Sequence, residues 1–255
     1  MAQLIERAQI INALKTALEP QPFALAMWEG GAASFGRIDE WSDLDLQVAA
    51  DDEHVGEIFP IVEHALASLS PIDLKYELPQ PAWHGHAQTF YRLRDASPYL
   101  MIDFVAMKAS APEKFLQSEI HGNAVVHFDK ANLVRAQPLD HVAFEAKLRD
   151  RVETLRVTFD LFQPLTLKEL NRGNDIEAIA FYQSWVLRPL VELLRIQHAP
   201  FHSNFHARYV HYDLPEPIVE KLQPLFYIRD VHDLCAKREQ AEKWFHEILE
   251  ESGRK

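Results

Sequence analysis

Residues 30–48 read GGAASFGRIDEWSDLDLQV and join two glycines, a short polar loop and a pair of alternating aspartates. Leu44 and Leu46 alternate with Asp43 and Asp45, a spacing that is typical of a strand with one buried face. Residues i and i+2 of a strand point to the same side, so the two carboxylates are expected to lie side by side. Like charges this close are unfavourable unless a positive group lies between them, and the pattern therefore indicates a cation site.

The paired aspartates suit a divalent metal ion. Carboxylate oxygens are hard ligands of the kind that Mg²⁺ prefers, and two such ions can clamp the attacking and leaving oxygens of nucleotidyl transfer. Two ions usually need a third carboxylate, and Asp103 supplies one as the lone charge in the apolar, strand-like run 99–107. Its apolar neighbours are expected to face the core, which leaves Asp103 on the opposite side. The sequence predicts that Asp43, Asp45 and Asp103 form one metal site.

The glycines in front of the aspartates favour an anion site. Gly30 and Gly31 let main-chain amides approach a phosphate closely, and the hydroxyl of Ser34 and the guanidinium of Arg37 are candidate phosphate donors. Each feature has a structural alternative when it is taken singly. Asp43 can cap a turn, the other carboxylates can lie on a solvated sheet face, and Arg37 can be a surface residue. Only the combination points to chemistry.

The stretch resembles the signature of the nucleotidyltransferase superfamily that includes DNA polymerase beta. That signature is Gly-Gly or Gly-Ser, a short loop, Asp-hydrophobic-Asp/Glu-hydrophobic, and a third acidic residue on a later strand. Within the superfamily the chain is most similar to small-molecule antibiotic adenylyltransferases of the aminoglycoside and lincosamide type. The form Gly-Gly-x-x-x-x-Gly-x-x-Asp-Glu-Trp-Ser-Asp-Leu-Asp-Leu over residues 30–46 carries this likeness.

The resemblance implies roles for individual residues. Asp43 and Asp45 match the metal-binding pair, and Asp103 matches the third carboxylate, which helps activate the acceptor or hold the second metal. The nucleotide-binding turn and the residue before the aspartates are matched by Gly30, Gly31 and Ser42. Relatives usually carry serine directly after the first or second glycine, where this chain has Gly31 and Ala32. Either Ser34 or main-chain amides are therefore expected to hold the triphosphate.

The periodicity and the resemblance together predict an α+β fold with two domains. Residues 1–135 are expected to form a nucleotidyltransferase domain with a mixed sheet and helices, and residues 136–255 a helical bundle that binds the acceptor. Helical spacing is seen at 3–18 and 52–68, and strand-like runs at 23–28, 43–48, 72–78, 88–94, 99–107 and 124–128. The second half has helical patterns at 141–161, 174–197, 217–226 and 229–250.

The helical half offers candidates for an acceptor base, because related antibiotic enzymes place an acidic base on a helix there. Asp175 and Glu177 are the candidates, with Glu192 a weaker one, and the alternative for Asp175 is a helix N-cap. Pro189 predicts a kink or break in its helix. The histidine- and aromatic-rich segment 198–213 is expected to be a loop whose rings line a pocket, in preference to a zinc site.

The composition limits the classes of partner. The chain has 26 basic and 38 acidic residues and a net charge of −12, which argues against a non-specific nucleic-acid binder. The acidic balance is compatible with a cationic substrate or simply with a solvated acidic surface. A single cysteine, Cys235, excludes a disulfide within the chain. There is no signal-like segment and no apolar run of about 18 residues, so a cytoplasmic protein without a membrane span is expected.

The activity expected from these features is Mg²⁺-dependent transfer of a nucleoside monophosphate, AMP from ATP, to a hydroxyl of a small-molecule acceptor with release of pyrophosphate. The required cofactors are two Mg²⁺ ions, with ATP or another nucleoside triphosphate as the substrate. One alternative is an enzyme that modifies a protein or RNA. A second alternative is a nucleotide-binding module without turnover, which Ala32 keeps open.

Overall fold

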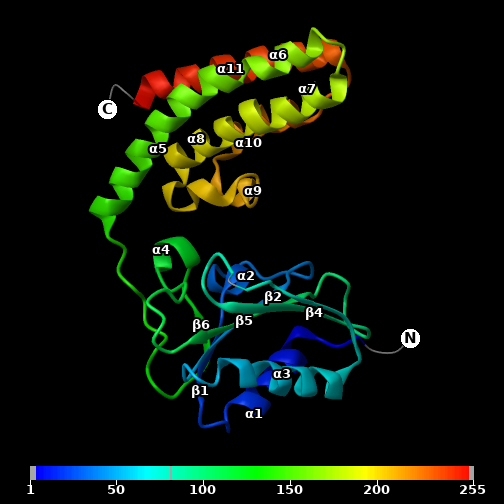
Figure 1. The fold of residues 1–255 in the computed structure, drawn as a ribbon, viewed down its shortest axis with the longest axis vertical. Helices are drawn as coiled ribbons and strands as arrows, with labels where there is room; N and C mark the ends of the chain where they lie inside the picture. Colours follow the sequence, from blue (N-terminus) through cyan, green and yellow to red (C-terminus); the bar gives the residue numbers. More distant parts are fainter. Residues whose placement is uncertain (1–3, 81, 253–255) are drawn as a thin grey trace. The chain divides into compact units, whose positions relative to one another are not determined.

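The computed structural model describes residues 4–80 and 82–252. The chain divides into two compact units, Met1–Leu139 and Asp140–Lys255. Among the described residues, every strand of the sheet belongs to the first unit and the second unit is built of helices (Figure 1). This is the α+β class that the sequence predicts, with a mixed sheet followed by helices. None of the helices in the described ranges is long and apolar enough to cross a membrane.

The sheet of the first unit has six strands in the order β3-β4-β5-β2-β1-β6. They are β1 (Ala24–Glu29), β2 (Leu44–Ala50), β3 (Ile72–Glu77), β4 (Ala87–Leu93), β5 (Ile102–Lys108) and β6 (Val125–Asp129). The central strands β2 and β5 run parallel, and the other neighbours run antiparallel. In the parallel pair Asp45 lies opposite Asp103 and Leu46 lies opposite Phe104. The two predicted aspartate strands are therefore direct neighbours.

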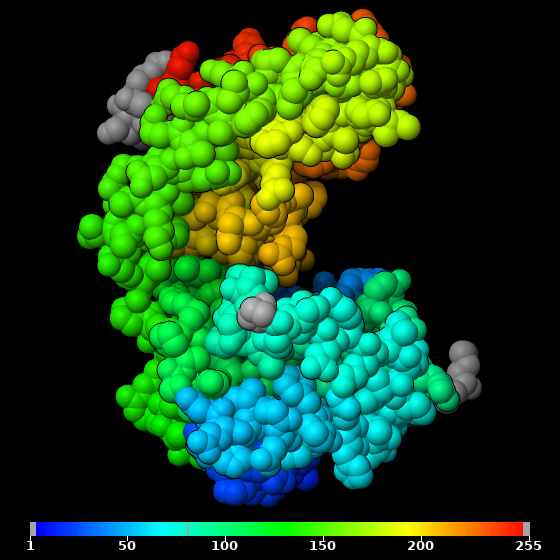
Figure 2. Space-filling view, in the orientation of Figure 1, coloured from blue at the N-terminus to red at the C-terminus, as the bar shows by residue number. Residues whose placement is uncertain are grey.

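Two helices cover one face of this sheet. These are α1 (Arg7–Leu18) and α3 (Val55–Leu69), whereas the short helices α2 (Gly31–Ser34) and α4 (Ser118–His121) lie on the opposite side (Figure 1). Figure 2 shows the surfaces of α1, in dark blue, and α3, in light blue, beside each other. Helix α1 forms because its apolar residues recur every four positions and lie on one face.

Alternation along the central strands divides the sheet into an apolar face and a partly polar face. Leu44 and Leu46 of β2 and Ile102 and Phe104 of β5 are fully buried against α1 and α3. Burial of one such side chain contributes about 1.5–3 kcal/mol. The aspartates between them point to the other face, which confirms the side of the sheet that the sequence predicts for Asp103.

The sequence-predicted strands are confirmed to within a few residues, but some short elements were missed. The run 99–107 begins as a strand only at Ile102, because Pro98 and the turn bonds Leu100 N to Ser97 O and Met101 N to Tyr99 O precede it. Helices α2 and α4 have four residues each, too few to produce a helical period in the sequence.

The second unit consists of helices joined by tight turns. They are α5 (His141–Phe162), α6 (Pro164–Leu170), α7 (Asp175–Tyr182), a π-helical turn (Gln183–Leu187), α8 (Arg188–His198), a 3₁₀ segment (Pro200–Phe205), α9 (Val210–Asp213), α10 (Glu216–Leu222), a second 3₁₀ segment (Gln223–Phe226) and α11 (Val231–Ser252). Their core includes Phe159 stacked on Phe245 with ring centroids 3.7 Å apart. Asp140 caps α5 by accepting a hydrogen bond from Ala143 N at 3.0 Å.

Three local expectations for this unit can be compared with the structure. The predicted break at Pro189 is confirmed as a π-helical turn that ends just before α8, where the proline can donate no main-chain hydrogen bond. The predicted N-cap at Asp175 is wrong, because Asn174 occupies that position and Asp175 lies in the first turn. The segment 198–213 is not simply a loop, because it contains a 3₁₀ segment and α9.

Candidate active site

Asp45 and Asp103 lie at paired positions of the two parallel strands, on the face opposite α1 and α3. Asp43 lies two residues before Asp45, just ahead of β2. All three side chains are partly buried. The structure therefore brings the three sequence-predicted carboxylates to one end of the parallel strand pair.

Burial and mutual repulsion make ionisation of this cluster unfavourable. The pKa of Asp45 is raised to about 7, first by burial and then by the charges of Asp43 and Asp103. From the ordinary value of 3.8 this is about 4 kcal/mol against the charged form. Burial also raises the pKa of Asp103, and a hydrogen bond from Gln88 opposes that rise. The cluster thus has too little positive charge nearby to stabilise all three carboxylates in their ionised form.

The chemistry of this donor set fits a hard divalent cation. The ligand atoms on offer are carboxylate oxygens, which suit Mg²⁺, and a cation would remove the repulsion that raises the pKa of Asp45. Within residues 4–80 and 82–252, no group of three or more His, Cys, Asp or Glu side chains is already arranged to hold a metal ion. The carboxylates would have to turn toward a cation when it binds.

The glycine turn presses directly against the aspartate pair. Gly30 N donates to Asp45 O at 3.0 Å, and Gly31 has a φ of +52°, in the left-handed region. A Cβ placed on Gly31 would lie 1.7 Å from Asp45 Oδ2. The turn therefore lies so close to the carboxylate that only glycine fits at position 31.

Ser34 is used to hold the turn. Its buried hydroxyl lies 2.8 Å from the carbonyl oxygen of Gly31 and also within hydrogen-bond distance of the carbonyl oxygen of His121. A hydroxyl has a single proton to donate, so these carbonyls already occupy the donor expected for a phosphate. The close packing of Gly122 against the Ser34 main chain holds the same contact from the other side.

The loop between the turn and β2 is closed by its own side chains. Asp39 Oδ1 accepts hydrogen bonds from Trp41 N at 3.0 Å and from Ser42 Oγ at 2.7 Å, while Asp39 N donates to Ser42 Oγ at 3.0 Å. Ser42 thus fixes the approach to Asp43. The guanidinium of Arg37 lies 5.1 Å from the centre of the Phe35 ring.

Sequence reasoning missed Arg7, which holds the main chain at Asp43 in place. Its Nη1 donates to the main-chain oxygen of Asp43, and its Nη2 pairs with the buried carboxylate of Glu29. Burial would raise the pKa of Glu29, but the bonds to His127 and Arg7 outweigh it and lower the pKa. The only signal in the sequence is a glutamate at the end of a buried strand, which needs a partner.

The predicted acceptor bases lie in the second unit. Asp175 and Glu177 are exposed in the first turn of α7, and no hydrogen bond among the described residues places either side chain in a site. Glu192, the weaker candidate, is paired with Arg151, with Nη2 2.8 Å from Oε2. That ion pair occupies the carboxylate that a base would need.

The histidine- and aromatic-rich segment is organised by Arg195, another residue that sequence reasoning missed. This fully buried arginine donates to His206 O at 2.6 Å, to Asp213 Oδ2 at 2.8 Å and to Arg208 O. His202 Nδ1 lies 3.0 Å from the same Asp213 oxygen. A charge inside the apolar run of α8 was the available signal, since a buried arginine needs acceptors.

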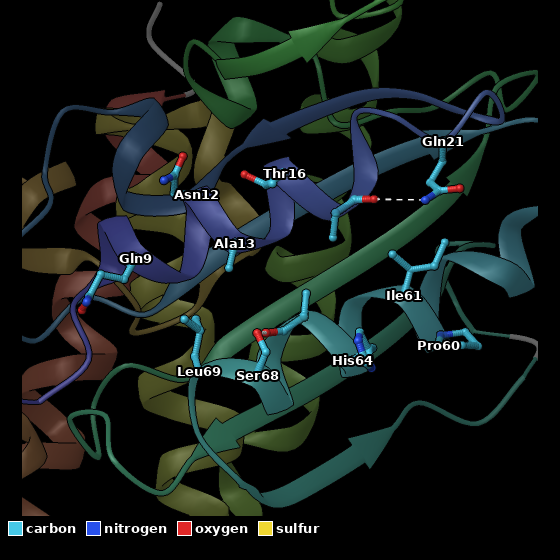
Figure 3. Close-up of a pocket in the computed structure, with 12 residues that line it drawn as sticks. Gln9, Asn12, Ala13, Thr16, Gln21, Pro60, Ile61, His64, Ser68 and Leu69 are labelled. Atoms are coloured by element: carbon cyan, nitrogen blue, oxygen red, sulfur yellow. Dashed lines mark hydrogen bonds between the residues drawn. The ribbon is translucent and has the colours of Figure 1, made fainter.

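An open surface groove of about 830 Å³ lies between α1 and α3. Figure 3 shows Gln9, Asn12 and Thr16 of α1 along one side and His64 and Ser68 of α3 along the other. This groove is on the helix-covered side of the sheet, away from the face that carries Asp45 and Asp103. It is therefore separate from the carboxylate cluster.

No protein-family model matches the chain, and no curated protein matches it. Among solved structures, it is similar to an aminoglycoside 6-adenyltransferase from Bacillus subtilis, with 12% identity over 96% of this chain and 90% of that chain and a TM-score of 0.34. It is also similar to a spectinomycin adenyltransferase from Enterococcus faecialis solved with ATP and spectinomycin, with 11% identity over 96% of this chain and 100% of that chain and a TM-score of 0.37. The chain is thus similar to antibiotic adenylyltransferases at low identity and a modest TM-score.

Proposed function

We propose that the chain is a cytoplasmic nucleotidyltransferase that moves AMP from ATP to a hydroxyl of a small-molecule acceptor and releases pyrophosphate. The observation that carries the proposal is the paired position of Asp45 and Asp103 on parallel strands, with Asp43 beside them. Burial and the neighbouring charges raise the pKa of Asp45 to about 7, so a bound cation would favour the fully ionised cluster. The metal ion of a metal–nucleotide complex would be such a cation.

The residues divide the chemistry between them. Asp43, Asp45 and Asp103 would hold Mg²⁺, which when bound neutralises phosphate charge. The main chain of Gly30 and Gly31 lies against Asp45 and would face the triphosphate, while the Gly30 amide itself donates to Asp45 O.

The transfer step forms one bond and breaks another. The acceptor oxygen bonds to the α-phosphorus as the bond from that phosphorus to the pyrophosphate oxygen breaks, and Asp103 takes the hydroxyl proton. Positioning and charge neutralisation provide most of the acceleration.

The acceptor is assigned to the helical unit. Asp175 and Glu177 are proposed as alternative acceptor bases, and Arg37 as a phosphate contact. The net charge of −12 favours an acceptor that carries positive charge. Such an acceptor would be drawn to the protein at low ionic strength more than at high ionic strength.

The proposal is tested by thermal denaturation with each ribonucleoside triphosphate, with and without Mg²⁺. Wild type is compared with Asp43→Ala, which keeps the main-chain oxygen that Arg7 binds, and with Asp51→Ala, an exposed aspartate just after β2. Mg²⁺ with ATP should raise the melting temperature of wild type and Asp51→Ala but not of Asp43→Ala. An acceptor screen for pyrophosphate release follows, and transfer that survives in Asp45→Ala would refute the mechanism.

A nucleotide-binding module without turnover is the second candidate, favoured by one observation. Ala32 stands where relatives carry serine, and the hydroxyl of Ser34 is already bonded to main-chain carbonyls. The triphosphate would then be held by main-chain amides alone. This function predicts stabilisation by nucleotide together with no pyrophosphate release with any acceptor.

A further inference from the structure

Asp103 stands at the end of a chain of hydrogen bonds that begins at a main-chain amide. His86 N donates to His84 Nδ1 at 3.1 Å, His84 Nε2 lies 3.0 Å from Gln88 Oε1, and Gln88 Nε2 donates to Asp103 Oδ1 at 2.6 Å. His84 and His86 precede β4, and Gln88 lies within it. Three side chains are thereby linked in series.

The first hydrogen bond of the series, from His86 N, determines which group donates in each of the following hydrogen bonds. A main-chain N–H can only donate, so Nδ1 of His84 must accept and its proton resides on Nε2. That proton points at Gln88, which turns the amide oxygen toward the histidine and the amide nitrogen toward Asp103. The chain is polarised in one direction and ends in an N–H donor against a carboxylate.

The surrounding rings hold His84 in this orientation. The Phe115 ring makes T-shaped contacts with His84, His86 and His121, with ring centroids 6.0, 5.3 and 5.4 Å away. Phe115 has a φ of +58°, a conformation that costs a non-glycine residue energy. The segment that carries it is held in place strongly enough to bear that cost.

We infer that His84 and Gln88 are positioning residues for Asp103, a role that rests on the proposed function of Asp103. Their hydrogen bonds fix one carboxylate oxygen, Oδ1, and leave Oδ2 without a bond from any described group. A carboxylate held by one oxygen keeps the other available, in a fixed direction, for a metal ion or an acceptor proton. Neither residue is expected to touch the substrate.

The first test needs neither metal nor nucleotide. Nitrogen-15 NMR of the resting protein should show the Nε2–H tautomer of His84, and the carboxyl carbon resonance of Asp103 should move in Gln88→Met. Gln117→Met is the matched control, because Gln117 also donates to a carboxylate, that of Glu113, at 2.8 Å. The inference would be overturned if His84 were the Nδ1–H tautomer, or if the carboxyl carbon shift of Asp103 were unchanged in Gln88→Met.

The second test uses Mn²⁺ alone as a probe, counted by electron paramagnetic resonance. Gln88→Met should weaken Mn²⁺ binding about tenfold, as loss of an outer-shell bond does, while Gln117→Met stays at the wild-type value. His84→Phe keeps a ring against Phe115 but removes the donor, so the double variant should bind no more weakly than Gln88→Met. If the losses of Mn²⁺ affinity in the two single variants add up in the double variant, the two changes act independently and a serial chain is refuted.

Failure of the proposed function gives a different result. If wild type and Asp45→Asn both bind no Mn²⁺, the metal site is refuted whatever the state of Gln88. The NMR test then decides separately whether His84 and Gln88 fix Asp103.

Discussion

Gly31 and Asp45 are packed so closely that a Cβ on the glycine would lie 1.7 Å from the carboxylate oxygen Oδ2. The glycine also has a φ of +52°, which disfavours any side chain. The turn and the aspartate pair are thus a single packed unit, and each limits what the other position can hold.

Gly31→Ala is expected to displace the Asp45 carboxylate. Gly36→Ala is the matched control, because Gly36 has a φ of +65° but no atom beyond its two chain neighbours lies within 4 Å of the position that a Cβ would take. Both variants should lose about 1 kcal/mol from the left-handed backbone, and only Gly31→Ala should lose more in urea denaturation. Stabilisation by Mg²⁺ with ATP should survive in Gly36→Ala and disappear in Gly31→Ala. Equal behaviour of the two variants would contradict the packing argument.

Asp45→Asn is expected to stabilise the metal-free protein. The folded pKa of about 7 lies above the ordinary 3.8, so the folded state binds the proton more tightly and loses stability as pH rises between these values. The amide removes this penalty, with an upper limit of about 4 kcal/mol at about pH 8 and almost no gain at about pH 4. Urea denaturation at the two pH values measures it, with Asp51→Asn as the control. A loss of stability at the higher pH would show that the carboxylate is not repelled in the folded state.

Arg7→Met should destabilise the first unit by about 3 kcal/mol, because it leaves the buried Glu29 carboxylate without its arginine. Adding Glu29→Gln should recover part of the loss, since the uncompensated charge is then gone. Urea denaturation of the two single variants and the double variant measures the coupling. A double variant as unstable as the sum of the single ones would mean that the two side chains do not act as a pair.

The ion pair of Arg195 and Asp213 should make the helical unit sensitive to acid. Burial opposes ionisation of Asp213, but the hydrogen bonds from Arg195 and His202 outweigh it and lower its pKa. The stabilisation is therefore present above the ordinary pKa and is lost as pH falls through the folded value. Asp213→Asn should cost about 3 kcal/mol near neutral pH, and the difference from wild type should shrink in acid. Asp175→Asn, on an exposed carboxylate, should have no comparable effect in the same pH series of denaturation curves.

Local periodicity was sufficient to predict the strands that carry the aspartates. Leu44 and Leu46 alternate with Asp43 and Asp45 within a few residues, and the apolar neighbours of Asp103 define its face in the same way. The strand register that makes Asp45 and Asp103 partners could not be predicted, because it depends on a pairing between distant segments. The three predicted aspartates lie together at the strand ends, whereas Asp175 and Glu177 lie in the second unit, and the catalytic roles of all of them remain predictions.

The residues that support the site had no local signal of their function. Arg7 acts through the main chain of Asp43, and Gln88 acts through Asp103, each across a long stretch of sequence. Ser34 was interpreted as a phosphate donor because it follows the glycine turn closely, yet its acceptors include the carbonyl of His121. Such partners are fixed by tertiary packing, which overrides the local pattern.

The parallel pairing of β2 with β5 couples formation of the core to formation of the site, because one strand register determines both. A slip of β5 by one residue would turn Asp103 toward α1 and α3 and bring Ile102 and Phe104 to the polar face. A carboxylate in that apolar layer would cost several kcal/mol, so the misaligned sheet would not persist. A molecule whose core has formed has therefore also placed Asp45 beside Asp103.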